Sequence, residues 1–118
     1  MEQLTVYFNP DCSKCKKLKI LLPSQDLNIK WVNYLANPLT EAELTVLLEK
    51  MDSQPSAVIR LTEEERAGLS EEEIFERLVA EPALLNRPII ERSQTAFLCR
   101  PLDIIKEKMP EFDWSAYL

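Results

Sequence analysis

Residues 3–23, QLTVYFNPDCSKCKKLKILLP, decide the fold of this chain. Their first six positions alternate apolar and more polar side chains, which is typical of a half-buried β-strand. Leucines then recur at helical spacing, so we expect a helix from Ser13 to Leu22 that ends at Pro23. Residues 29–35 are rich in β-forming side chains and predict a second strand. The two strands should be parallel, because a strand–helix–strand unit joins parallel strands.

The middle of the chain is predicted to be helical. Thr40 with Glu43, and Ser70 with Glu73, have the spacing of capping boxes, and apolar residues follow each pair at helical spacing. We expect residues 56–65, which lie between these helices, to form a short helical turn with Arg60 at its end.

The last third returns to strands. Residues 87–93 and 95–99 predict an antiparallel hairpin, and Pro101 is expected in the first turn of a final helix that buries Leu102, Ile105 and Met109. The order is βαβ, a helical insertion, then ββα. We therefore predict an α/β, thioredoxin-like fold with a mixed four-stranded sheet, as a single domain over residues 1–118.

Composition excludes several classes of function. The net charge of −6 argues against direct nucleic-acid binding, and a single glycine allows no glycine-rich phosphate loop. Histidine is absent, which excludes His-based acid–base catalysis and His-containing metal sites. No apolar run is long enough to span a bilayer, and residues 1–6 lack the pattern of a secretory signal. We expect a cytoplasmic protein with no membrane contact.

Two cysteines, Cys12 and Cys15, lie where the first strand gives way to the helix. Helix N-terminal amides and the four lysines between positions 14 and 19 should lower the pKa of the Cys12 thiol, and the same amides favour an anionic substrate. The spacing also allows a disulfide. Three cysteines without histidine do not supply four zinc ligands. Two buried, inert thiols are the other alternative, which we disfavour because thiols among so many lysines are expected to be exposed. C-x-x-C beside a βαβ pattern favours redox chemistry.

Two arginine–proline pairs add a possible anion site. Arg87–Pro88 opens a strand and is a candidate for a cis peptide bond. The predicted fold would bring Arg87 to Cys12, and Arg100 follows the adjacent strand. Together with Arg60, these guanidinium groups would bind a tetrahedral oxyanion through bidentate hydrogen bonds. The alternative is that each arginine is a solvated surface residue. Cys99 lies in an apolar run and is expected in the core.

Five segments resemble the ArsC family, which comprises the glutaredoxin-linked arsenate reductases and their relatives. They cover about residues 4–110 in the family's order and read YFNPDC, WVNYLANPLTEAEL, IRLTEEE, LLNRPII and LCRPLDII. The resemblance implies that Cys12 attacks arsenate, that Arg60, Arg87 and Arg100 hold the oxyanion, and that Pro88 is the family's cis-proline. It also implies glutathione as a co-substrate, glutaredoxin or thioredoxin as a partner, no bound cofactor or metal, and a monomer.

Three positions depart from the family pattern. Phe8 stands where the family often has histidine, Cys15 where arsenate reductases commonly have serine, and Lys16 where arginine is usual. Cys15 is similar to the C-x-x-C of the Spx-type regulators, relatives that bind RNA polymerase but generally lack a counterpart of Arg100. We predict an arsenate reductase in which Cys15 is a possible resolving thiol. The alternatives are an Spx-like redox regulator and a thiol–disulfide oxidoreductase of unknown substrate.

Overall fold

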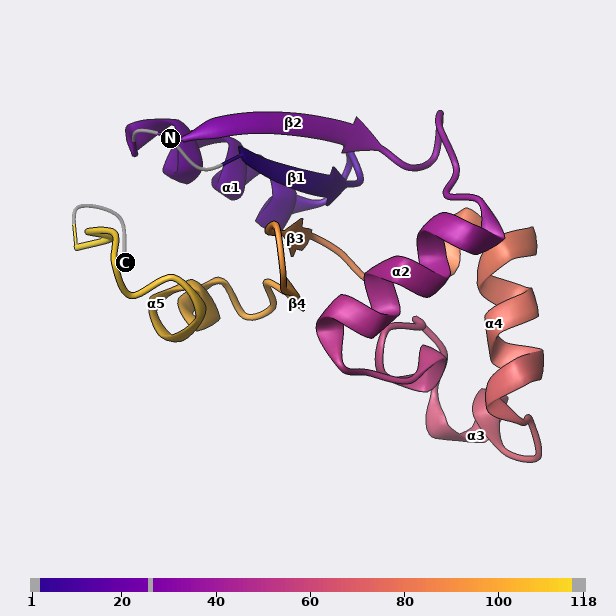
Figure 1. Cartoon of the computed structure of the whole chain (residues 1–118). Coiled ribbons are helices and arrows are strands. Elements are labelled where there is room, and N and C mark those ends of the chain that lie inside the picture. Colours follow the sequence, from indigo (N-terminus) through magenta and orange to yellow (C-terminus); the bar gives the residue numbers. More distant parts are fainter. Residues whose placement is uncertain (1–2, 26, 116–118) are drawn as a thin grey trace.

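A mixed four-stranded sheet lies at the centre of the molecule (Figure 1). The computed structural model describes residues 3–25 and 27–115. The strand order is β2-β1-β3-β4; β1 and β2 are parallel, whereas β3 is antiparallel to both β1 and β4. The parallel pair and the hairpin confirm the prediction from sequence. The strands are β1 (Gln3–Phe8), β2 (Asn28–Asn33), β3 (Ile89–Glu91) and β4 (Ala96–Leu98).

The helices follow the predicted order around this sheet. They are α1 (Ser13–Leu21), α2 (Glu41–Met51), α3 (Glu63–Arg66), α4 (Glu71–Ala80) and α5 (Ile105–Lys108). Short 3₁₀ turns cover Leu22–Ser24, Pro55–Ala57, Pro82–Leu84 and Leu102–Ile104. The capping boxes at Thr40 and Ser70 form as predicted, and Thr62 with Glu65 makes a third. The element order and the sheet establish the thioredoxin-like α/β fold. No helix in the described part of the chain is long and apolar enough to cross a membrane.

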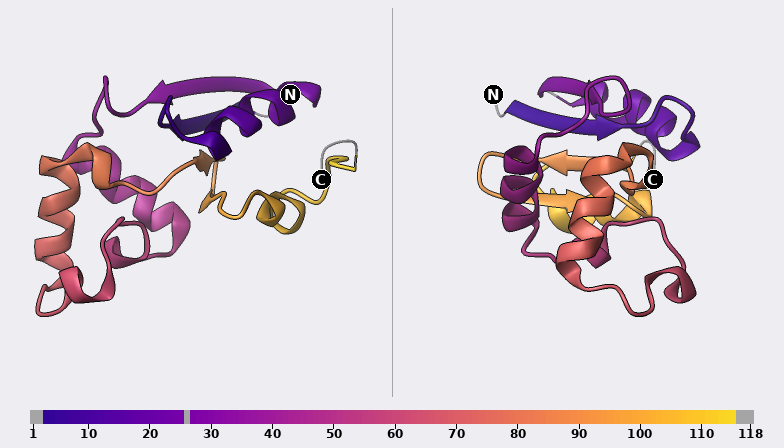
Figure 2. Two further views of the ribbon diagram at one scale, coloured as in Figure 1. Left: turned by 180° about the vertical axis from the view of Figure 1, so that it is seen from behind. Right: turned by 90° about the vertical axis from the view of Figure 1, so that its right-hand side faces the viewer.

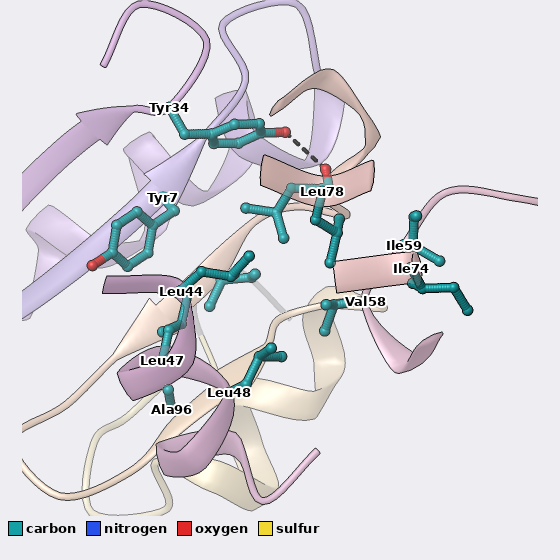
Figure 3. Close-up of a cluster of buried hydrophobic side chains, with 12 residues drawn as sticks. Tyr7, Tyr34, Leu44, Leu47, Leu48, Val58, Ile59, Ile74, Leu78 and Ala96 are labelled. Atoms are coloured by element: carbon teal, nitrogen blue, oxygen red, sulfur yellow. Dashed lines mark hydrogen bonds between the residues drawn. The ribbon is translucent and has the colours of Figure 1, made fainter. Parts of the chain in front are cut away.

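The two faces of the sheet are covered by different helices (Figures 1 and 2). Because side chains alternate along a strand, Leu4 and Val6 of β1 pack with α1 and α5, whereas Tyr7 points to the side of α2 and α4. The apolar cluster on the side of α2 and α4 includes Leu44, Leu47, Leu48, Ile74 and Leu78 (Figure 3). The sheet therefore separates the layer formed by α1 and α5 from the helical insertion.

The helix α1 ends at Leu21, just before Pro23, as predicted, and Pro23 lies inside the 3₁₀ turn Leu22–Ser24 that follows. Another local prediction is wrong. Residues 56–65 are not one helical turn. Ile59 forms an isolated antiparallel bridge with Leu85, so the chain is extended between two short helical pieces. This bridge, rather than a helix, sets the position of Arg60.

Ile90→Val is expected to lower the free energy of unfolding by about 1 kcal/mol. Ile90 is fully buried in β3, so the lost methylene leaves an unfilled space beneath α1 and α5. Denaturant titration measures the change. Ile20→Val removes the same methylene from a side chain that is 66% exposed and should change stability much less. Equal losses in the two variants would contradict the assignment of Ile90 to the core.

Candidate functional site

The loop between β1 and α1 holds Cys12 as the N-cap residue of α1. The Cys12 N–H donates to the Asn9 carbonyl at 3.0 Å, and the Asp11 N–H donates to Asn9 Oδ1 at 2.9 Å. The Cys12 carbonyl accepts from the Lys16 N–H at 3.0 Å, so it begins the helix ladder. Asn9 therefore fixes the loop that positions the thiol, a role that the sequence analysis did not assign.

Both thiols of the C-x-x-C pair are buried, contrary to the expectation from their lysine-rich surroundings. Cys12 is 5% exposed and Cys15 is 1% exposed, and both pack against Phe8 and Trp31. Lys14 is half-buried, and the other three lysines of α1 are exposed. A helix presents different faces at successive positions, so a lysine-rich sequence does not require exposed cysteines.

Burial does not make Cys12 inert. Burial itself opposes ionisation, but the Cys15 N–H, the Cys15 thiol, the Arg87 guanidinium and the Lys14 N–H lower the pKa of Cys12 to about 7. The net result is a thiol that is substantially ionised at neutral pH. The prediction of a lowered pKa agrees with the structure, although the lysine side chains are not among its causes.

Cys15 has the opposite character. Burial raises the pKa of Cys15 to about 11, and the neighbouring Cys12 thiolate contributes to the increase. Cys15 is therefore a protonated hydrogen-bond donor to the Cys12 thiolate at neutral pH. Cys12 is therefore the more readily ionised thiol of the pair, and its role as a nucleophile stays a prediction. The structure contains no disulfide between them.

Two of the predicted arginines reach Cys12. Arg100 Nη1 lies 4.0 Å from Cys12 Sγ and donates to the Arg87 carbonyl at 3.2 Å. Nε and Nη1 of Arg87 are buried and have no hydrogen-bond partner among the described residues. The Arg87–Pro88 peptide bond is cis, as expected from the sequence, and the Arg100–Pro101 bond is cis as well. These guanidinium groups offer unused donors beside a thiolate, which is a setting for an oxyanion.

Arg60 lies farther from the thiol. Its N–H donates to the Leu84 carbonyl at 2.8 Å, its side chain is exposed, and no hydrogen bond joins it to Cys12 within the described residues. Its charge nevertheless acts on Tyr34, together with that of Arg87. Arg60 therefore lies at the edge of the site, and its role in holding an anion stays a prediction.

Two features of the site were missed by sequence reasoning. Tyr34 is buried, donates to the Leu85 carbonyl at 3.0 Å (Figure 3), and has its pKa raised to about 12 by burial. Lys19 Nζ lies 4.1 Å from the centre of the Phe8 ring, and Phe8 packs edge-on against Trp31. A cation above two aromatic rings thus covers the apolar side of the thiol pair. Neither arrangement has a local sequence signal.

Cys99 lies in the core. It is fully buried, and burial raises its pKa to about 12, as expected for a core thiol. Among the described residues, no group of three or more cysteine, aspartate or glutamate side chains is placed to hold a metal ion.

The fold and the site define a thioredoxin-like protein with an activated cysteine and an arginine pair beside it. A model of the ArsC family matches residues 7–108, and this chain belongs to that family. It is 27% identical to an arsenate reductase of Escherichia coli K12 over 124 aligned residues, covering 99% of this chain and 88% of that protein. An arsenate reductase of Yersinia enterocolitica is 28% identical with the same coverage.

Solved structures agree with this assignment. An arsenate reductase from Vibrio cholerae superposes with a TM-score of 0.79 at 26% identity, covering 90% of this chain and 97% of that one. A putative arsenate reductase from Yersinia pestis gives 0.78 at 27% identity, covering 88% and 98%. The similarity thus extends over the fold and the segment that contains the site.

Alkylation of Cys12 by iodoacetamide is expected to rise with pH and reach half its plateau rate near pH 7, because the thiolate reacts and the pKa of Cys12 is about 7. Cys15→Ala should move this midpoint upward, since it removes a donor to the thiolate. Peptide mass spectrometry identifies the labelled cysteine. A midpoint near that of an unperturbed thiol would contradict the described hydrogen bonds.

Proposed function

We propose that this protein reduces arsenate to arsenite, with Cys12 as the nucleophile and Arg87, Arg100 and Arg60 as the oxyanion site. The observation that carries the proposal is the position of two arginines. Arg100 lies 4.0 Å from the thiol sulfur, and Arg87 has two buried nitrogens without a hydrogen-bond partner among the residues that the structure describes. Such donors suit a tetrahedral oxyanion. The names of the relatives supply arsenate as the specific anion.

The first step forms a covalent adduct. The Cys12 thiolate attacks arsenic, a sulfur–arsenic bond forms, and an arsenic–oxygen bond breaks with the oxygen leaving as hydroxide, which takes a proton to become water. Arsenic keeps its oxidation state in this step. The arginines neutralise the charge of arsenate and hold it against the thiolate, so that two anions can meet.

The second step is the reduction. A thiolate attacks Cys12 Sγ, a disulfide forms, the sulfur–arsenic bond breaks, and its electron pair stays on arsenic, which leaves as arsenite. Glutathione is the attacking thiol in the favoured route, and glutaredoxin then reduces the mixed disulfide. No bound cofactor or metal takes part.

Cys15 provides a second route. Its thiol hydrogen-bonds to Cys12 and shares the same buried cluster, so it is placed to attack Cys12 Sγ in place of glutathione. The resulting Cys12–Cys15 disulfide would be reduced by thioredoxin or glutaredoxin. Loss of a proton must precede the attack, because Cys15 has a raised pKa. The proposal includes a single-domain monomer in the cytoplasm, where such reductants keep thiols reduced.

The test is arsenate-dependent oxidation of NADPH. One assay contains glutathione, glutaredoxin and glutathione reductase, and the other contains thioredoxin and its reductase. Turnover in the first assay is expected, and dependence on Cys15 in the second alone would identify it as the resolving thiol. No turnover in either assay, from folded protein with a titratable Cys12, would overturn the proposal in favour of the regulator or of another substrate.

A further inference from the structure

We propose that a groove beside α1 binds glutathione, recognised as a peptide thiol with two carboxylates and one ammonium group; this inference rests on the proposed function. The groove has a volume of about 460 Å³ and lies between α1 and the 3₁₀ turn that follows β4. Its walls include Lys14, Lys17, Ile20, Leu21, Leu102 and Asp103.

Cys12 does not line the groove, but the residues that follow it in the chain do. Ser13 and Lys14, which line it, directly follow Cys12 on α1. On the opposite wall, Leu102 and Asp103 follow the Arg100–Pro101 pair, and Arg100 lies 4.0 Å from Cys12 Sγ. The segment that follows β4 packs with α1 in one apolar cluster, and both lie on the same face of the sheet (Figure 1). A thiol bound in the groove would therefore have its sulfur near Cys12 and its charged ends farther along α1.

The charged side chains of the groove are complementary in sign and number to the charged groups of glutathione. Lys14 and Lys17 are one helical turn apart on α1, so their ammonium groups line one face. Asp103 supplies a single carboxylate on the facing wall. None of these three side chains forms an ion pair with another residue in the part of the chain that the structure describes. Two lysines are thus available to two carboxylates, and one aspartate to one ammonium group.

The apolar part of the groove is also exposed. Ile20 is 66% exposed, the largest exposed fraction among the bulky apolar side chains that the structure describes. With Leu102 it provides an apolar surface between the charges, which fits the methylene groups of the peptide. Residues 13–24 contain no acidic side chain, so the α1 wall attracts carboxylates although the whole chain has a net charge of −6.

The test uses glutathione disulfide and needs no arsenate. The Cys12 thiolate attacks one sulfur of the disulfide, a Cys12–glutathione bond forms, and the sulfur–sulfur bond breaks to release the other half as glutathione thiolate. Every protein in the test carries Cys15→Ser, so the reaction stops at the mixed disulfide. Mass spectrometry follows its formation, and hydroxyethyl disulfide, which carries no charge, reports the intrinsic reactivity of the thiolate.

Lys14→Gln with Lys17→Gln is expected to slow the reaction with glutathione disulfide about 10-fold, since two partly exposed ion pairs are lost. The rate with hydroxyethyl disulfide should change less than about 2-fold. Asp103→Asn should slow the reaction of Cys12 with glutathione disulfide about 3-fold. It should not slow the reaction with an analogue of glutathione disulfide that lacks the amino groups. Lys16→Gln with Lys106→Gln removes the same charge from exposed positions outside the groove and is the matched control.

Several outcomes would overturn the proposal that the groove binds glutathione. One is an equal loss with the charged and the uncharged disulfide, which would indicate a changed thiolate and not a changed binding site. Another is an equal loss in the control double variant, which would indicate general charge steering. A loss seen only with glutaredoxin as the reductant would assign this face to a protein. Because arsenate is absent, selective loss here together with no arsenate turnover would leave the groove standing and reject the reductase.

Discussion

Cys12→Ser is expected to abolish arsenate reduction, with a loss of about 10⁴-fold or more in turnover. Serine keeps the size and the place at the N-cap of α1, but its hydroxyl is not ionised at neutral pH. The thiol that it replaces has a pKa of about 7. No sulfur–arsenic bond can form without it. Chromatographic separation of arsenite from arsenate measures the product directly, without depending on the coupling enzymes.

The matched control for this variant is Cys99→Ser. Cys99 is fully buried in the apolar cluster that contains Leu18 and Ile90, and burial raises its pKa to about 12. Its replacement should cost stability, since it puts a hydroxyl into an apolar core, but folded protein should keep its turnover number. A Cys12→Ser variant that retains a large share of the wild-type activity would show that another group carries the reaction.

Arg100→Ala is expected to lower kcat/KM for arsenate about 10²-fold, which is the second large effect. The guanidinium lies 4.0 Å from Cys12 Sγ and is half-buried, so its loss removes both a donor to the oxyanion and its charge. Reaction of Cys12 with an uncharged disulfide should change only a few-fold. Steady-state kinetics with arsenate and the rate of disulfide exchange give the two values.

Arg77→Ala is the control for the arginine site. Arg77 is exposed on α4, where it pairs with Glu81 at 2.7 Å, and its loss removes the same charge far from the thiol. It should leave both rates unchanged. If Arg100→Ala lowered arsenate turnover and disulfide exchange equally, the arginine would act on the thiolate alone, and the oxyanion site would be rejected.

Most of the fold could be predicted because its signals are local. The alternation in β1, the leucine spacing of α1 and the capping boxes at Thr40 and Ser70 each depend on residues a few positions apart. The prediction of one helical turn over residues 56–65 was wrong for the opposite reason. Their extended part is held by Leu85, a residue distant in sequence, and single-sequence patterns do not reveal such a partner.

The sequence named the residues of the candidate site, but it did not predict their environment. Cys12, Arg87 and Pro88 stand out from the spacing of C-x-x-C and from the arginine–proline pair. The burial of both thiols and the position of Tyr34 follow from how β1, α1 and β2 pack, which sequence spacing does not contain. The source of the lowered pKa of Cys12 was also partly missed, because backbone donors, the Cys15 thiol and Arg87 cause it and not the nearby lysine side chains.

The central claim is that an arginine-held oxyanion meets the Cys12 thiolate. The most direct measurement is the rate at which iodoacetamide alkylates Cys12 at neutral pH as arsenate is increased, with no external thiol present. Saturable protection of Cys12 is predicted, and Arg100→Ala should require a much higher arsenate concentration for the same protection. An alkylation rate that is the same at every arsenate concentration, in protein whose Cys12 titrates near pH 7, would contradict the claim.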